Sequence, residues 1–181
     1  MQLYAFSAFL SAFATLFTLI TGILFFTKGG RFGFLNDLSS VFQVIFMIPL
    51  AIYFQLILSS GSLILSTLVF ILGLSGMLYA LYGQSLLVLR KINFNRSLKY
   101  IPAGAAIGLW LITINLTASG FNITPDTLGW LGVFAGSGYI LTVTAFLIFG
   151  SKHFLFYLGS FITGISYPIW AIWLGLIILS T

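Results

Sequence analysis

The sequence predicts an all-α integral membrane protein, a single domain over residues 1–181 built as a bundle of six transmembrane helices. Hydrophobic residues make up 60% of the chain and charged residues only 5%, whereas about a quarter of the residues in a soluble domain are charged. Long apolar stretches alternate with short polar segments. A helix of about 20 residues crosses a hydrocarbon core of roughly 30 Å, so a chain of 181 residues accommodates six or seven crossings.

Six apolar stretches are long enough to cross a membrane, and turn or capping residues mark their limits. The first ends at the basic, glycine-containing segment 28–31. It lacks a basic start and a cleavage site, so we interpret it as a retained helix and not as a signal peptide. The second follows Asn36 and Asp37, which are typical N-cap residues, and the fourth has Pro102 in its first turn. The predicted helices cover residues 3–27, 38–59, 63–89, 100–118, 127–150 and 155–179.

The basic side chains occupy every second connection between these stretches. All seven Lys and Arg residues lie in the segments 28–37, 90–99 and 151–154, and the other two connections contain none. Lys and Arg are enriched in cytoplasmic loops, so these three segments are predicted to be cytoplasmic and both termini to lie outside. An even number of crossings also requires the termini to share a side, so the charge pattern supports the count of six.

Charge and cysteine content exclude several classes of function. The net charge is +5, but basic residues divided among three loops are explained by membrane orientation and anionic lipid headgroups, so we expect no nucleic-acid partner. Since the chain has no cysteine, disulfides, thiolate metal sites and thiol catalysis are excluded. The longest basic segment supplies the predicted anionic-lipid contacts, Arg90, Lys91, Arg96 and Lys99.

No ionisable side chain is expected inside the predicted spans. Asp37, Asp126 and His153 fall at loops or helix ends, which disfavours an ion-coupled transporter driven by a buried carboxylate. A cytoplasmic acid–base pair of Asp37 and His153 is the best enzymatic candidate. The simpler interpretation is that Asp37 caps the second helix, where the helix dipole favours it, and that His153 is an interfacial turn residue. We therefore expect no catalytic residue and no metal site, although a lone histidine can be an axial ligand of haem or a pigment.

Two mid-helix prolines and several amides are the candidates for a polar cavity. Pro49 and Pro168 each remove a backbone hydrogen bond, and the resulting kink either opens a pocket at the midplane or bends the helix without one. Polar side chains within the spans either line such a cavity or hydrogen-bond between helices. The candidate lining residues are Gln43, Gln55, Gln84, Asn115 and Tyr79.

Glycine spacing predicts one helix contact. Gly104 and Gly108 in the fourth stretch, and Gly132 and Gly136 in the fifth, have the GxxxG spacing that lets two helices approach closely. We expect these two helices to touch there.

Two segments carry a resemblance to a known group. Residues 34–43 (FLNDLSSVFQ) with the run to Pro49, and residues 167–175 (YPIWAIWLG), resemble uncharacterised bacterial six-helix membrane proteins of the domain-of-unknown-function kind. The likeness spans most of the chain. Members of that group often have Arg after the final Leu-Gly pair, where this chain has Leu176. The resemblance implies a bacterial inner-membrane protein and no activity.

These observations favour a non-enzymatic function. The first hypothesis is an accessory or scaffold subunit that packs against lipid, pigment or another membrane protein, in a larger complex or as a homo-oligomer. The second is an uncoupled carrier or channel for a small uncharged solute, with a site at the midplane near the two proline kinks. A membrane enzyme is the third, and it would need a charged group facing an accessible cleft. No cofactor is predicted, bound lipid is expected, and a pigment remains an alternative.

Overall fold

The computed structural model describes residues 1–180, and this range contains helices and turns but no strand. The long helices are α1 (Gln2–Lys28), α2 (Arg31–Leu58), α3 (Leu63–Val88), α5 (Pro102–Gly120), α6 (Asp126–Phe149) and α7 (Phe154–Ser180). The short helix α4 (Phe94–Ser97) and the 3₁₀ helix η1 (Leu98–Tyr100) lead into α5. Six helical segments are long and apolar enough to cross a membrane, which confirms this part of the predicted fold class.

One predicted helix boundary is wrong. The second helix begins at Arg31 and not at residue 38, whereas the predicted limits of the other five lie within two residues of those observed. Gly29 and Gly30 adopt φ angles of 66° and 64°, a region that glycine enters without steric cost, so they complete the turn by themselves. Gly30 is the N-cap of α2. Asp37 is therefore not the cap and lies inside the helix, about 9 Å along the axis from its start at 1.5 Å per residue.

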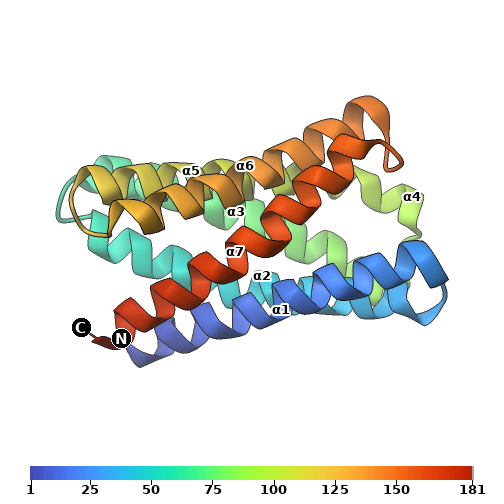
Figure 1. Ribbon diagram of the computed structural model, residues 1–181, viewed down its shortest axis with the longest axis horizontal. Coiled ribbons are helices and arrows are strands. Elements are labelled where there is room, and N and C mark those ends of the chain that lie inside the picture. Colours follow the sequence, from blue (N-terminus) through green and yellow to red (C-terminus); the bar gives the residue numbers. More distant parts are fainter. Residues whose placement is uncertain (181) are drawn as a thin grey trace.

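The six long helices form a closed ring. Neighbours in the ring follow the chain from α1 to α2, α3, α5, α6 and α7, and α7 then contacts α1. In Figure 1, α7 crosses the molecule diagonally, lying beside α6 at one end and beside α1 at the other. Both termini lie at the end where α7 meets α1.

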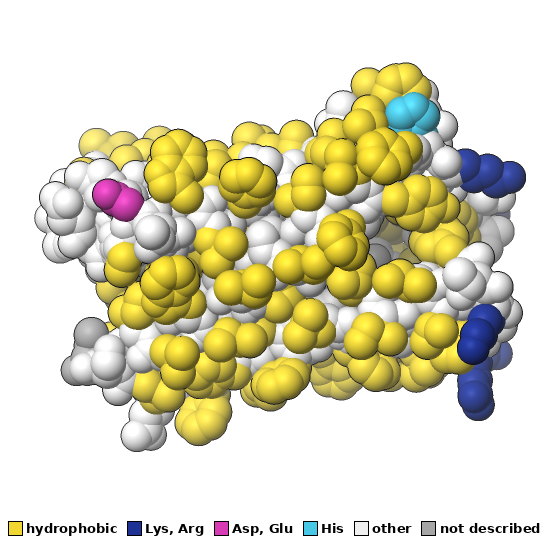
Figure 2. Space-filling view, in the orientation of Figure 1, with side chains coloured by type: hydrophobic (Ala, Val, Ile, Leu, Met, Phe, Trp, Pro, Cys, Tyr) yellow, Lys and Arg dark blue, Asp and Glu magenta, His cyan; other side chains and the backbone are white. Residues whose placement is uncertain are grey.

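The two ends of the ring differ in charge. The basic end carries the α1–α2 turn, the α3–α5 connection with α4, and the α6–α7 turn, and these contain every Lys and Arg of the chain. Figure 2 shows the visible Lys and Arg side chains gathered at that end. The terminal end carries the two chain ends, the α2–α3 turn and the α5–α6 loop.

Glycines bring α5, α6 and α7 into close contact. A Cβ atom on Gly108 would lie 2.6 Å from the Gly136 carbonyl oxygen, and one on Gly136 would lie 2.4 Å from the Gly108 oxygen. Gly104 meets Val143, and Gly132 lies against the side chain of Asn115, so all four glycines singled out by their spacing lie between α5 and α6. Gly138 of α6 and Gly159 of α7 make a second close pair. A Cβ atom added to either glycine would lie 2.9 Å from the carbonyl oxygen of the other.

The contact between α7 and α1 combines small residues with one hydrogen bond. Ala5, Ala8 and Ala12 of α1 are fully buried. The hydroxyl of Tyr167 donates to Ser11 Oγ over 2.9 Å. These short side chains let two helices from opposite ends of the chain pack together and complete the ring.

Large side chains fill the terminal half of the ring. Trp110, Trp170 and Tyr167 are fully buried and Phe54 almost fully. The ring of Phe54 stacks on Trp170 with centroids 6.0 Å apart, and it meets Trp110 edge-on at 6.4 Å. This half is therefore a solid aromatic core, and any internal space must lie toward the basic end.

We predict that Gly108→Ala destabilises the ring and that Gly120→Ala does not. The added methyl on Gly108 would clash with the Gly136 backbone, and relieving this clash should cost about 1–3 kcal/mol. A Cβ on Gly120, also in α5, meets nothing within 4 Å. Unfolding in mixed micelles, followed by tryptophan fluorescence, measures both free energies. Equal stability of the two variants would contradict the close α5–α6 packing.

Candidate functional site

A cavity of about 1160 Å³ occupies the basic half of the ring. All six long helices contribute to its lining, together with α4 and η1. Toward the terminal end, its lining stops at Thr15, Val44, Tyr139 and Gly164. The fully buried core follows directly beyond this level, so the cavity is blind, that is, closed toward the terminal end.

A hydrogen bond across the ring forms the floor of the cavity. Gln43 of α2 donates through Nε2 to the hydroxyl of Tyr139 on α6, at 2.6 Å. Gln43 is 93% buried, since only 7% of its surface is exposed. Because α2 and α6 are not neighbours in the ring, this bond joins opposite walls. One turn beyond Gln43, Met47 is fully buried in the core.

Aromatic side chains make up one wall. Phe146 of α6 and Phe156 of α7 have ring centroids 5.9 Å apart, and Phe156 meets Phe26 of α1 edge-on at 6.2 Å. Phe25, also on α1, lies 5.4 Å from Phe26. All four line the cavity. At this end α7 has moved away from α1 toward α6 (Figure 1), and the gap between α1 and α7 is bridged by Phe26 with Phe156 and Tyr157.

A carboxylate lines the cavity on the side of α2. Asp37 is half-buried and belongs to the lining. Its carboxylate accepts a hydrogen bond from the Asn36 side chain, and it forms no ion pair with any Lys, Arg or His of residues 1–180. The sequence predicts Asp37 at a helix cap outside the spans, and the early start of α2 shows that this placement is wrong. The alternative pairing of Asp37 with His153 is also absent from the described residues. The His153 ring stacks on Phe149 at 4.3 Å, and its Nδ1 accepts from the Leu155 amide.

A second acceptor in the cavity has no partner. Gln84 of α3 lines the cavity, and its Oε1 atom is buried without a hydrogen-bond partner among residues 1–180. Asn36 and Ser40, on α2 beside Asp37, line the same region. The charged and amide groups of the lining are therefore supplied by α2 and α3, and serines and threonines of α1, α4, α6 and α7 line the cavity as well.

The remaining sequence-predicted cavity residues lie elsewhere. Gln55 donates to Thr67 Oγ1 at 3.3 Å between α2 and α3. Asn115 is fully buried and accepts from Trp170 Nε1 at 2.8 Å. Tyr79 is exposed, and its hydroxyl donates to the Lys99 carbonyl oxygen. These three residues connect elements of the fold, whereas Gln43 and Gln84 alone of the five line the cavity.

The proline kinks do not form the cavity. Pro49 lies within α2 and Pro168 within α7, and neither belongs to the lining. Pro168 is buried against the terminal-half core. The cavity thus lies nearer the basic end than the midplane site expected from the sequence.

Four exposed cations lie in the α3–α5 connection, beside residues that line the cavity. Arg90, Lys91, Arg96 and Lys99 are all exposed, in the connection that also sends Phe94, Ser97 and Leu98 into the lining. The ammonium of Lys99 lies 4.9 Å from the centre of the Tyr100 ring. The predicted lipid-binding residues therefore lie at the basic end of the ring, beside the cavity.

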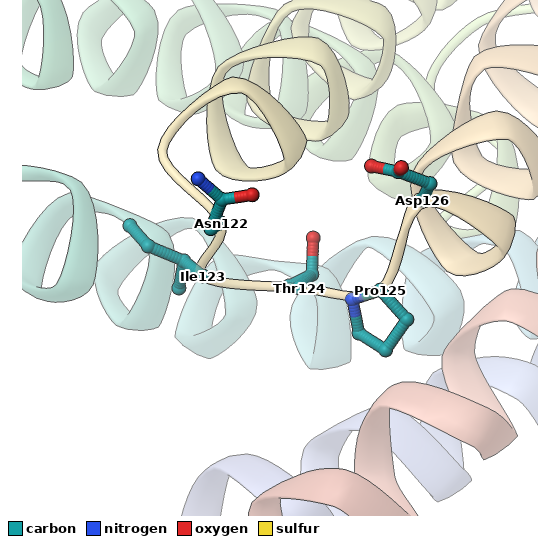
Figure 3. Close-up of a pocket in the computed structure, with 5 residues that line it drawn as sticks. All are labelled: Asn122, Ile123, Thr124, Pro125 and Asp126. Carbon is teal, nitrogen blue, oxygen red and sulfur yellow. The ribbon is translucent and has the colours of Figure 1, made fainter.

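A smaller, shallower pocket lies at the terminal end. It has a volume of about 400 Å³ and is formed by the α5–α6 loop. Figure 3 shows Asn122 and Asp126 on either side of it, with the Thr124 side chain between them. The Asp126 carboxylate accepts a hydrogen bond from Ser119. Since one short loop supplies all of its lining, this pocket offers fewer contacts to a ligand than the cavity inside the ring.

Sequence reasoning missed most of the cavity wall. Tyr139, Thr142 and Phe146 share one face of α6, and Thr15, Thr18 and Gly22 share one face of α1. Polar or small residues at spacings of three, four or seven inside an apolar stretch were the available signal. The same signal also marks helix contacts, so it could not separate the two roles.

Comparison with known proteins does not assign the chain to a family. Within residues 1–180, no group of three or more His, Cys, Asp or Glu side chains could hold a metal ion. No protein-family model matches the chain, and no curated protein and no solved structure matches it either.

Proposed function

We propose that this protein is a carrier of the bacterial inner membrane that binds a small solute with an apolar body and a polar group. The observation that supports this proposal is the blind cavity of about 1160 Å³ inside the ring, with an aromatic wall and a polar side. Pockets that hold small molecules have volumes of about 300–1,000 Å³ and are mostly apolar with a few polar groups. The cavity has this composition.

The shape of the cavity favours a carrier over a channel. A channel needs a continuous path, whereas the fully buried aromatic core fills the terminal half of the ring. Alternating access would require the Gln43–Tyr139 bond to open and the core helices to separate. A cavity that is closed toward one end of the ring corresponds to one state of such a cycle.

The arrangement of charge gives the proposed orientation. Basic loops remain on the cytoplasmic side of membranes, so the basic end and the cavity beside it would face the cytoplasm and both termini the outside. The exposed lysines and arginines of the basic end would contact anionic lipid headgroups. The accessory or scaffold function, a bound pigment and a larger complex stay predictions from the sequence.

Cysteine accessibility tests the orientation. The chain contains no cysteine, so single substitutions give an unambiguous signal. We expect Ser40→Cys, in the cavity lining, to react with a membrane-impermeant methanethiosulfonate in inside-out vesicles and not in right-side-out vesicles. Ser60→Cys, exposed in the α2–α3 turn, should show the reverse pattern. Labelling of Ser40→Cys from the right-side-out face alone would contradict the proposed orientation.

Filling the cavity tests the function. We expect members of a panel of small aromatic alcohols, amines and acids to raise the thermal stability of the protein, by about 2.7 kcal/mol when ligand is present at 100 times its Kd. Ser40→Trp should abolish this response because the indole occupies the cavity. Proteoliposome counterflow of the stabilising solutes then distinguishes a carrier from a static binding protein.

The matched control is Ser75→Trp. Ser40 and Ser75 are both helical and both donate to a carbonyl oxygen of the preceding turn, but Ser75 is exposed on α3 and outside the cavity. It should keep the wild-type response. A panel that leaves the wild type unchanged, or a Ser40→Trp variant that responds like wild type, would overturn the proposed function.

A further inference from the structure

We infer that the ligand of the cavity is a protonated organic amine, with its ammonium group at Asp37 and its apolar body against the aromatic wall. This inference rests on the proposed function and narrows its solute to one chemical class. The first observation is the carboxylate itself. Asp37 is half-buried in the lining and has no cationic partner among residues 1–180.

A half-buried carboxylate whose hydrogen-bond partner is the neutral Asn36 side chain, with no cation beside it, is costly. Removing an ionised group from water carries a penalty of several kcal/mol that only a partner of opposite charge or strong hydrogen bonds repay. The protein supplies seven cations, yet all are exposed at the basic end and none pairs with Asp37. A bound cation would provide the missing partner.

The second observation concerns hydrogen-bond direction. The buried Oε1 atom of Gln84 has no donor, and the Asp37 carboxylate is itself an acceptor. At the floor, the Tyr139 hydroxyl accepts from Gln43 and keeps its own proton available. The Asp37 carboxylate and Gln84 Oε1 are therefore two acceptors at the cavity that lack a cationic or donor partner sufficient to balance them. An ammonium group presents up to three donors and no acceptor, so it complements these two atoms, whereas a carboxylate or phosphate ligand would face like charge at Asp37.

The aromatic wall suits the remainder of the molecule. Phe25, Phe146, Phe156 and Tyr139 line the cavity from α1, α6 and α7. Aromatic faces attract cations, by about 2 kcal/mol or more where water is excluded, and they bury an apolar body equally well. The wall and the carboxylate together favour an amine that carries an aromatic or alkyl group.

An inorganic cation fits less well. Ca²⁺ takes six to eight oxygen ligands and Mg²⁺ an octahedral set, and residues 1–180 contain no cluster of three acidic or histidine side chains. The exposed cations at the basic end also oppose a highly charged ion. Their effect on a monovalent amine is limited, because salt screens exposed charges over about 8 Å at physiological ionic strength.

The test compares ammonium ions with alcohols of the same shape. The panel pairs arylalkylammonium ions with their alcohols, starting from 2-phenylethylammonium and 2-phenylethanol. Calorimetric titration into protein in lipid nanodiscs, with empty nanodiscs as the reference, gives each affinity. We expect the ammonium member of at least one pair to bind wild type at least about tenfold more tightly, and Asp37→Asn, an isosteric change, to remove that preference.

Matched variants separate a local effect from a general one. Asp126→Asn changes the only other acidic side chain of the chain, which lies at the terminal end, and should keep the preference. Gln84→Leu should weaken ammonium binding about threefold to tenfold. Gln55→Leu, which removes a second buried and unpartnered Oε1 outside the cavity, should leave it unchanged.

The outcomes distinguish this inference from the proposed function. Ammonium binding that is unaltered in Asp37→Asn would overturn the inference. Alcohols that bind where no ammonium ion does would overturn it too, while leaving a small-solute site in place. If no member of the panel binds wild type, the inference and the proposed function both fail.

Discussion

The distance at which neighbouring helices pack is the constraint on which this structure depends. Where Gly108 meets Gly136, and Gly138 meets Gly159, a single methyl group would collide with the opposite backbone. The small side chains of Ala5, Ala8, Ala12 and Ser11 likewise let α1 and α7 pack closely together. These contacts allow six helices to close into a ring in which the α7 crossing is oblique. An oblique crossing is close at one end and open at the other. The small residues at the helix contacts therefore account both for the solid terminal half and for the hollow basic half.

Much of the fold follows from apolar length and charge position, and the site does not. Both limits of five helices were predicted within two residues because each limit was marked by a break in hydrophobicity. The sixth was misplaced since Asn36 and Asp37 are good capping residues, and the stronger signal, Gly29 followed by Gly30, was treated as a helix stop alone. That one error moved Asp37 out of the predicted membrane span and hid the carboxylate of the cavity.

The polar side chains show why a site is harder to predict than a bundle. Gln43, Gln55, Gln84 and Asn115 are alike in sequence, each an amide within an apolar stretch. In the structure, Asn115 accepts from Trp170 and Gln55 reaches Thr67, whereas Gln43 spans the ring and Gln84 retains a free acceptor. Which role each takes depends on the angle between helices distant in sequence. Hydrophobic periodicity carries no information about that angle.

Closure of the ring by α7 also determines the order in which the molecule can assemble. In a chain synthesised from its N-terminus, α1 to α6 are made before α7, and they can form only an open arc. The alanine face of α1 and the Gly138 face of α6 then remain uncovered until the last helix arrives. The contact that completes the fold joins Ser11 to Tyr167, among the longest sequence separations in the chain, and such contacts form late because loop closure must precede them. The cavity therefore has no complete wall during most of synthesis, because α7 supplies part of its lining and arrives last.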